Sequence, residues 1–152
     1  MAVRAIRGAT QLELDEREHL LGRTTELVRA VLRENALSTD DLISMVFTAT
    51  DDVRSEFPAY AARVLGLVDV PLMCARELEF EGSLPRVVRL MMHVETPLTR
   101  AEVTHVYLHG AAMLRRDLTH VRTDTGQTTD HQTAEGLAGR TGHQTTAEQG
   151  GS

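Results

Sequence analysis

The chain has 152 residues, of which 41% are hydrophobic, 3% are aromatic and none is tryptophan. This length and apolar content fit one domain with an aliphatic core. The formal net charge of −6 argues against general nucleic-acid binding, which usually requires a basic surface. The single cysteine, Cys74, excludes an intramolecular disulfide and fits a reducing compartment. Since neither a signal peptide nor a membrane-spanning apolar run is visible, we expect a soluble, cytoplasmic protein.

Strand-like and helix-like segments alternate between residues 2 and 118. From the N-terminus we expect a strand over residues 2–10, a helix over 15–35, a turn at 38–41, a strand over 42–50 and a helix over 57–66. A strand over 67–74, a strand over 86–95, a short helix over 99–103, a strand over 104–108 and a compact turn or short helix over 110–118 follow. Pro71 predicts that the strand over 67–74 lies at a sheet edge or contains a bulge. Thr99 and Glu102 indicate a capping box for the short helix.

The helix predicted over residues 15–35 has the clearest pattern. Its apolar side chains recur at helical spacing on one face: Leu20, Leu21, Leu27, Val28, Val31 and Leu32. Asp15 and Glu18 suit an N-terminal capping pair, and Asn35 suits the C-terminal cap. Charged residues cover the other face, which indicates a solvated helix that packs on a sheet and carries no chemistry.

The strand predicted over residues 86–95 is the most informative stretch. Side chains alternate across a strand, so one face carries Val88, Leu90, Met92 and Val94, and the other carries Arg89, Met91, His93 and Glu95. Arg89 is a permanent cation in an apolar run, and burying it is costly unless it is paired. A structural partner such as Glu77 or Glu79 is one explanation. An anionic ligand is the other, and the strand by itself leaves both open.

The composition changes near residue 120, where Thr, Gln, Gly, Asp and His replace the large apolar residues. Such a segment buries too little apolar surface to offset its chain entropy. We therefore expect a folded domain over residues 1–119 and a low-complexity, disordered tail over 120–152. The histidines of this tail are too widely spaced to indicate a metal site.

The usual catalytic signatures are missing from the sequence. It has no phosphate-binding glycine loop, dinucleotide fingerprint, nucleophile elbow or zinc motif, and it has no lysine for Schiff-base chemistry. Cys74 lies at the end of a predicted strand, where a lone cysteine is more often a small buried side chain than a nucleophile.

Four arginines at strand ends and in loops remain as candidates: Arg7, Arg63, Arg89 and Arg115. The planar guanidinium group binds carboxylates through two parallel hydrogen bonds, so these residues would make an anion site if they converge. Taken singly, Arg7 also fits a solvated surface residue, and Arg63 fits a cation at the C-terminus of a helix.

Several segments carry a family resemblance. In chain order they are Arg4 to Thr10, Ala49-Thr50, Phe57-Pro58-Ala59 with Arg63, Val70-Pro71 with Cys74 and Glu77, Arg89 to Met92, His105 to Leu108, and Leu114 to Leu118. In this order and near this spacing, they resemble the small trimeric chorismate mutases of the α/β-barrel class. The resemblance spans essentially all of residues 3–118.

The resemblance implies a fold and a reaction. The fold is α+β, a mixed sheet with helices on one side, and three subunits close a pseudo-α/β-barrel with active sites between neighbours. The reaction is the Claisen rearrangement of chorismate to prephenate in aromatic amino-acid biosynthesis, which needs no metal or other cofactor. The implied partners are therefore chorismate, prephenate and further copies of this chain, without nucleic acid or membrane.

The resemblance also implies roles for individual residues. Arg89 would stabilise the negative charge that grows on the ether oxygen in the transition state. Arg7 and Tyr107 would hold a substrate carboxylate, and Glu77 would take the ring hydroxyl, so Arg89, Glu77 and Arg7 form the expected catalytic set. Further substrate contacts would come from Phe57, Ala59, Arg63, Leu72, Met73, Cys74, Leu114 and Arg115.

The chain departs from the family pattern at Tyr60, where lysine is common, and at Met73, where threonine is common. Two other functions are compatible with the same architecture: a non-catalytic trimer that binds a small carboxylate, or an imine or enamine deaminase with a site between subunits. The joint presence of Arg7, Glu77, Arg89 and Tyr107 favours the mutase, because a simple binding protein would not need the full set.

Overall fold

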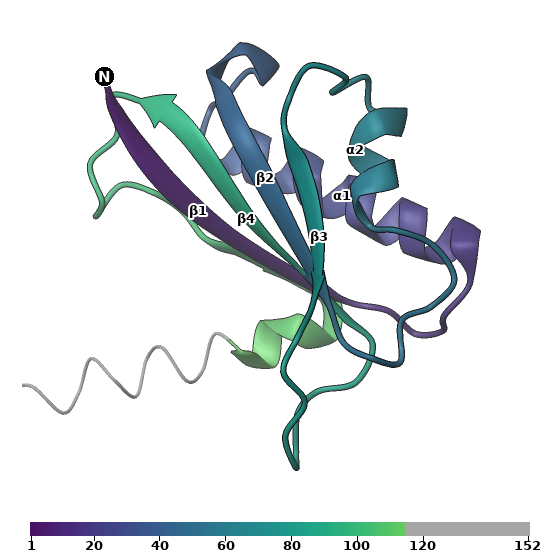
Figure 1. Ribbon diagram of the computed structural model, residues 1–152. Helices are drawn as coiled ribbons and strands as arrows, with labels where there is room; N and C mark the ends of the chain where they lie inside the picture. The colour runs from purple at the N-terminus through teal and green to yellow at the C-terminus, as the bar shows by residue number, and fades with distance from the viewer. Residues whose placement is uncertain (115–152) are drawn as a thin grey trace, which may run out of the picture.

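The structure is a computed structural model that describes residues 1–114. Its elements are β1 (Ala2–Gln11), α1 (Arg17–Glu34), η1 (Thr39–Asp41), β2 (Leu42–Ala49), α2 (Ala59–Val64), β3 (Leu72–Arg76), β4 (Val87–Thr96), β5 (Val106–Leu108) and η2 (His109–Met113). The strands form one sheet in the order β3-β2-β4-β1-β5, and α1 and α2 lie on the same side of it (Figure 1). The predicted mixed sheet with helices on one side is therefore confirmed. The predicted tail and the predicted boundary at residue 119 lie outside the described residues.

The strand β4 lies at the centre of the sheet. It runs antiparallel to β1 on one side and to β2 on the other. Two shorter strands complete the edges, with β5 parallel to β1 and β3 parallel to β2. The strand predicted over residues 86–95 is thus confirmed, displaced by one residue, and β3 has the edge position that Pro71 predicted. In the part of the chain that the structure describes, no helix is both long and apolar enough to cross a membrane.

One face of the sheet packs against α1 and forms the core. The strands contribute Ile6, Met45, Phe47, Val88, Leu90, Met92 and Val94, all of them buried. The helix contributes Leu20, Leu27, Val28 and Val31, which confirms the predicted apolar stripe. Gly8 permits the close approach of the helix, because a Cβ at this position would lie 3.1 Å from side-chain atoms of Leu27 and Val31.

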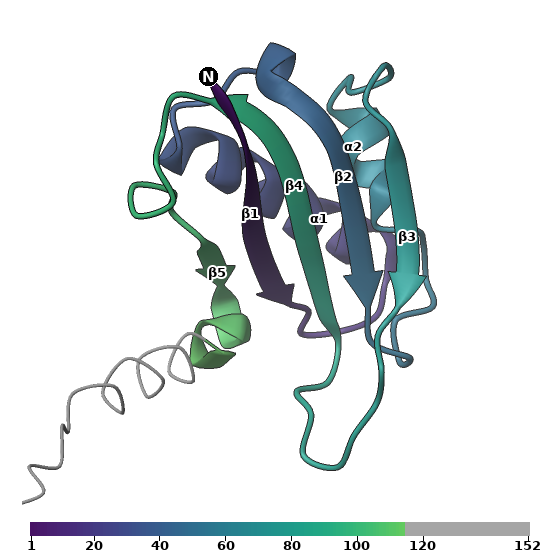
Figure 2. The same cartoon turned by 60° about the vertical axis from the view of Figure 1, so that its left-hand side comes forward.

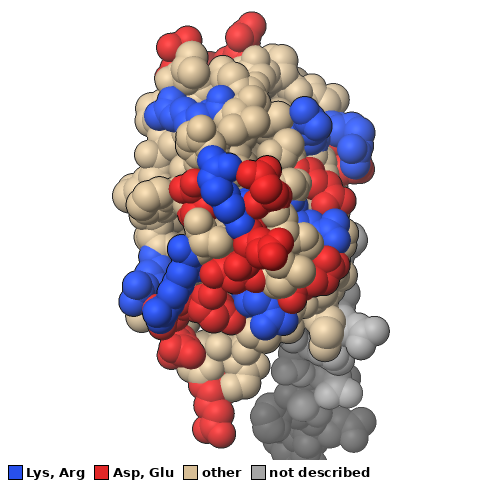
Figure 3. Space-filling view, turned by 90° about the vertical axis from the view of Figure 1, so that its right-hand side faces the viewer, with Lys and Arg blue, Asp and Glu red and all other residues tan. Residues whose placement is uncertain are grey.

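The solvent side of α1 is charged, as its sequence indicated. Figure 3 shows basic and acidic side chains interspersed over this side of the molecule. Arg17 pairs with Glu18 and with Glu56, at 2.8 and 2.9 Å, and its guanidinium lies 5.3 Å from the centre of the Tyr60 ring. Exposed pairs of this kind each contribute little to stability, and we assign no chemistry to this surface.

Two predictions about the ends of elements were wrong. The Asp15 side chain does not cap α1, because its carboxylate accepts the backbone N–H groups of Arg54 and Ser55, at 2.9 and 3.2 Å. The strand predicted over 67–74 is paired only from Leu72 to Arg76. Proline has no N–H to donate, and pairing begins where the carbonyl of Pro71 accepts the N–H of Met45 at 3.0 Å.

The short helix predicted over residues 99–103 is also wrong, since this segment forms a turn. Glu102 accepts the backbone N–H of Thr99 at 2.8 Å, which is half of the predicted capping box. A segment of five residues cannot recover the cost of helix nucleation without further packing.

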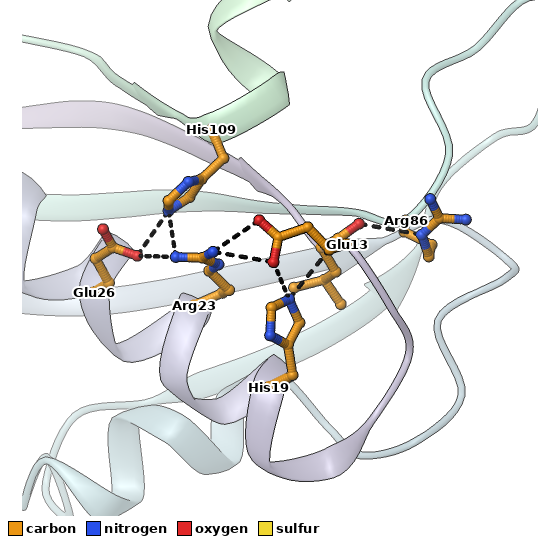
Figure 4. A network of polar contacts seen from close by, with 7 residues as sticks. Glu13, His19, Arg23, Glu26, Arg86 and His109 are labelled. Atoms are coloured by element: carbon orange, nitrogen blue, oxygen red, sulfur yellow. Dashed lines mark hydrogen bonds and ion pairs between the residues drawn. The ribbon is translucent and has the colours of Figure 1, made fainter.

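A polar network holds η2 against α1 (Figure 4). Nε2 of His109 lies 2.9 Å from a Glu26 carboxylate oxygen and 2.8 Å from Nη1 of Arg23. Arg23 also donates to both carboxylate oxygens of Glu13, at 2.8 and 3.1 Å. His109 has a φ of 52°, in the left-handed region that side chains other than glycine rarely adopt, so its contacts hold an unfavourable backbone turn in place.

Asn35 confirms the predicted C-terminal cap of α1 and ties this helix to the chain that leads into β5. Its buried side chain donates to the carbonyls of Val31 and Thr104, at 2.8 and 2.9 Å, and accepts the N–H of Thr104 at 2.8 Å. The end of the helix and the start of the last strand therefore depend on one amide group.

We expect Asn35→Ala to lower the free energy of unfolding by about 2–4 kcal/mol, because backbone groups lose their partners where water cannot replace them. Denaturant unfolding followed by circular dichroism measures this loss. The exposed neighbour gives a matched control, since Glu34→Ala should change stability by less than about 0.5 kcal/mol. Equal losses for the two variants would contradict the role of Asn35.

The Glu26–His109 contact predicts a pH-dependent stability. The hydrogen bond from His109 lowers the pKa of Glu26, against the opposing effect of burial. A carboxylate with a lowered folded-state pKa stabilises the protein above its unfolded pKa of about 4.3, and this contribution disappears as the pH falls through the folded-state pKa. Because the Glu26 side chain is 47% exposed, solvent screening keeps the effect small.

We therefore expect Glu26→Gln to reduce stability at pH 7 by less than about 1 kcal/mol. The difference between the variant and the wild type should shrink below a pH of about 4. Thermal unfolding measured from pH 3 to pH 8 tests this expectation. A difference that stays constant over the whole range would show that the charge of Glu26 does not contribute.

Candidate functional site

The sheet face opposite α1, called the open face below, brings together side chains from four strands. Arg7 of β1 lies opposite Met91 of β4, and Arg89 of β4 lies opposite Thr48 of β2. Tyr107 of β5 pairs beside Ala9, which itself lies opposite Arg89. Neither α1 nor α2 covers this face (Figure 2). A cavity of about 310 Å³ lies on it, lined by Arg7, Val46, Thr48, Arg89, Met91 and Tyr107.

Arg89 is paired within the protein. Its Nε lies 2.7 Å from Oε1 of Glu77, and the two side chains are 32% and 14% exposed. The structural partner that the sequence suggested is therefore real, and it is Glu77. This contact engages one side of the guanidinium, and neither terminal nitrogen of Arg89 makes a hydrogen bond within residues 1–114. Arg89 is thus held by the protein and still presents donors to the cavity.

Glu77 is fixed from two further directions by β2. Its backbone N–H donates to the carbonyl of Ala49 at 3.0 Å, just beyond the end of β3. The hydroxyl of Thr48 donates to Oε1 at 2.6 Å, the same oxygen that faces Arg89. The carboxylate is therefore oriented by a hydroxyl and a guanidinium together. Sequence analysis did not single out Thr48; its position opposite Arg89 depends on the pairing of β2 with β4.

Tyr107 carries a buried hydroxyl that has no hydrogen-bond partner among the described residues. An unpaired buried hydroxyl is costly, and such groups in native proteins call for an explanation. Tyr107 lines the open-face cavity together with Arg7, whose side chain likewise makes no hydrogen bond within residues 1–114. A phenol and a guanidinium that face one cavity suit a ligand carboxylate.

His105 binds the backbone of Arg7. Its Nδ1 accepts the backbone N–H of Arg7 at 3.1 Å. A ring nitrogen can accept only when it carries no proton, so this hydrogen bond requires the neutral imidazole. Burial, and then the charge of Arg7, lower the pKa of His105, which favours the neutral form. The structure thus gives His105 a hydrogen-bonding role.

The remaining predicted residues form a second group at the other edge of the sheet. A cavity of about 530 Å³ lies beyond the ends of β2 and β3, and Phe57, Thr48 and Cys74 are part of its lining. Sγ of Cys74 accepts the backbone N–H of Ala59 at 3.4 Å, and burial raises the pKa of the thiol, which disfavours a nucleophilic role. Leu72 is partly buried beneath this edge, whereas Met73 is 58% exposed.

Arg63 has the capping role that its position suggested. Its Nη1 donates to the carbonyls of Leu67 and Val68, at 3.2 and 2.6 Å, beyond the end of α2. Leu114, the last described residue, packs with Ala111 of η2. Arg115 lies outside the described residues. The structure thus places Arg7, Arg89 and Tyr107 around one cavity, with Glu77 paired to Arg89, and it places Phe57 and Cys74 in the lining of another cavity of the same chain.

Comparisons with known proteins identify relatives along the described domain. The family model for type I chorismate mutases matches residues 3–118. The chain is 39% identical over 119 residues to the chorismate mutase AroH of Bacillus subtilis, covering 78% of this chain and 94% of that protein. It is 44% identical over 117 residues to AroH of Thermus thermophilus, covering 76% of this chain and 96% of that protein.

A solved structure agrees with the sequence comparisons. The chorismate mutase from Clostridium thermocellum matches with a TM-score of 0.71 and 40% identity, covering 72% of this chain and 98% of that one. The match of the family model over most of the chain, together with these identities, shows that the chain belongs to the type I chorismate mutase family.

Proposed function

We propose that this chain is a chorismate mutase and converts chorismate to prephenate by an intramolecular Claisen rearrangement. Membership of the family supports the reaction. The observation that carries the residue assignment is the pairing of Arg89 with Glu77 at 2.7 Å, beside a cavity that Arg7 and Tyr107 also line. Among the described residues, the terminal nitrogens of Arg89, the side chain of Arg7 and the Tyr107 hydroxyl have no hydrogen-bond partner, and this set fits a substrate that carries two carboxylates.

The proposed mechanism needs no proton transfer and no covalent intermediate. As the carbon–oxygen bond of chorismate lengthens, negative charge grows on the ether oxygen. The terminal nitrogens of Arg89 would stabilise this charge more in the transition state than in the ground state, which is the condition for a higher kcat. Because Glu77 already holds the guanidinium, little reorganisation accompanies the reaction.

The other residues on the open face would select the reactive conformer. Arg7 and the Tyr107 hydroxyl would hold a carboxylate, and the carboxylate of Glu77 would accept the ring hydroxyl. Fixing these groups converts a flexible substrate into a near-attack geometry, which accounts for a large part of many enzymatic rate enhancements. We place the activity in the cytoplasm, where a free thiol such as Cys74 stays reduced.

We further propose that the active unit is a homotrimer with its sites between subunits. Arg7, Arg89 and Tyr107 line one cavity of the chain, whereas Phe57 and Cys74 line another, so the second pair would come from a neighbouring copy. Large apolar side chains also remain exposed near the open face and in the loop before β4: Val3, Met73, Leu78 and Phe80. Such exposure in a single chain indicates association. On this view residues 1–119, including Arg115, form the mutase domain.

The first test of the function is turnover of chorismate by the purified protein without added cofactor, with prephenate identified as the product. We expect Arg89→Ala to lower kcat about a hundredfold or more, as removal of one oxyanion donor does elsewhere. Arg29→Ala, on the exposed side of α1, is a matched control that should keep full activity. Near-normal kcat in Arg89→Ala would refute the assigned mechanism, and binding of chorismate without turnover would favour a non-catalytic protein.

The trimer is tested by complementation between two inactive variants. Arg89→Ala removes one group of residues, and Phe57→Glu disrupts the other at an exposed position. If neighbours share each site, random mixed trimers should regain about one intact site in four, because the interface is heterologous. Sedimentation of the mixture confirms the trimer mass. Mixed trimers without any recovered activity would show that each site lies within one chain.

A further inference from the structure

We propose that Thr48 is a positioning residue for the reaction. Its hydroxyl holds the Glu77 carboxylate in the orientation that leaves the terminal nitrogens of Arg89 available to substrate. This inference rests on the mutase function proposed above, and it adds Thr48 to the proposed set of Arg7, Glu77, Arg89 and Tyr107.

One hydrogen bond and one ion pair meet at a single oxygen of Glu77. The Thr48 hydroxyl donates to Oε1 at 2.6 Å, and Nε of Arg89 lies 2.7 Å from the same atom. The hydroxyl takes one lone-pair position of Oε1, and the guanidinium lies against the same oxygen. Within residues 1–114, Oε2 accepts no hydrogen bond. The arrangement thus leaves one carboxylate oxygen free for the ring hydroxyl of the substrate.

The strand pairing fixes Thr48 for this role. Thr48 lies directly opposite Arg89 in the antiparallel pair and beside Ala75 in the parallel pair. The next residue of β2, Ala49, accepts the backbone N–H of Glu77 at 3.0 Å, so β2 holds both the backbone and the side chain of Glu77. Threonine is stiff about χ1, and its hydroxyl therefore holds a direction better than a longer polar side chain would.

The absence of this hydroxyl would change the ion pair. A carboxylate and a guanidinium prefer a two-pronged contact, in which both oxygens meet two N–H groups. With Oε1 occupied by Thr48, Glu77 is held to a one-sided contact. Without Thr48, rotation of Glu77 would bring Oε2 onto a terminal nitrogen of Arg89. The ion pair would survive. However, a terminal nitrogen of Arg89 would then bind Glu77 instead of the ether oxygen, and Oε2 of Glu77 would no longer be available to the ring hydroxyl.

Thr48 also lies where the two groups of site residues approach each other within one chain. It is part of the lining of the open-face cavity and of the cavity that Phe57 and Cys74 line. A change of side-chain shape here would disturb both cavities, so the test must keep the shape and remove only the hydroxyl. Valine has the shape of threonine without the hydroxyl, and serine keeps the hydroxyl without the methyl group.

Steady-state kinetics of chorismate turnover test the proposal in Thr48→Val and Thr48→Ser. We expect Thr48→Val to lower kcat roughly tenfold, the effect of one lost hydrogen bond to a charged group, with a smaller change in KM. Thr48→Ser should stay within about twofold of the wild type, since the donor remains. Thr25→Val on α1 is the matched control and should leave both constants unchanged. Thermal unfolding of each variant separates a loss of function from a loss of fold.

A second background shows whether Thr48 acts through Glu77. In Glu77→Ala there is no carboxylate to orient, so adding Thr48→Val should lower kcat by less than about twofold. A full tenfold loss in that background, or wild-type kcat in the single variant Thr48→Val, would overturn the proposal. These outcomes differ from failure of the proposed function, which would show as a wild-type protein that produces no prephenate.

Discussion

The site depends on a cation held at the centre of a sheet. Arg89 is a cation in a half-buried position, which is tolerable only with a partner. Glu77 provides that partner, with its Oε1 2.7 Å from Nε of Arg89. It follows the edge strand β3, which is separated from β4 by β2. Because β4 is paired along both sides, the backbone that carries Arg89 has little freedom to move. The ion pair with Glu77 and the strand pairing of β4 therefore both hold the charged group of Arg89 in place.

This arrangement is suited to a reaction whose only large demand is electrostatic. A rearrangement without proton transfer gains nothing from a perturbed acid or base, and burial raises the pKa of the Cys74 thiol, which disfavours the thiolate. What the reaction can use is a donor already in place where charge develops. The structure provides such donors on the open face, together with the Tyr107 hydroxyl, which has no hydrogen-bond partner within residues 1–114.

The open face supports the proposal that a neighbouring copy of the chain completes the site. The helices cover one side of the sheet only, which leaves apolar side chains of the other side and of the loop before β4 in solvent. Met73 is 58% exposed and Leu78 is 94% exposed. In the proposed trimer, a neighbouring copy would cover these residues and contribute Phe57 and Cys74 to the site of Arg89 and Tyr107. Assembly and completion of the site would then be one event.

The sequence by itself determined the parts whose signal is periodic or local. Apolar spacing identified α1, alternation identified β4 and its buried face, and an arginine in an apolar run pointed to an ion pair. Only the tertiary structure decided which carboxylate pairs with Arg89, because Glu77 and Glu79 are equivalent by spacing and differ by the anchoring of Glu77 to Ala49. The roles of Thr48 and His109 also emerged only from the tertiary structure, because each contacts a residue far away in the chain. Such contacts follow from strand register and helix packing and leave no local pattern in the sequence.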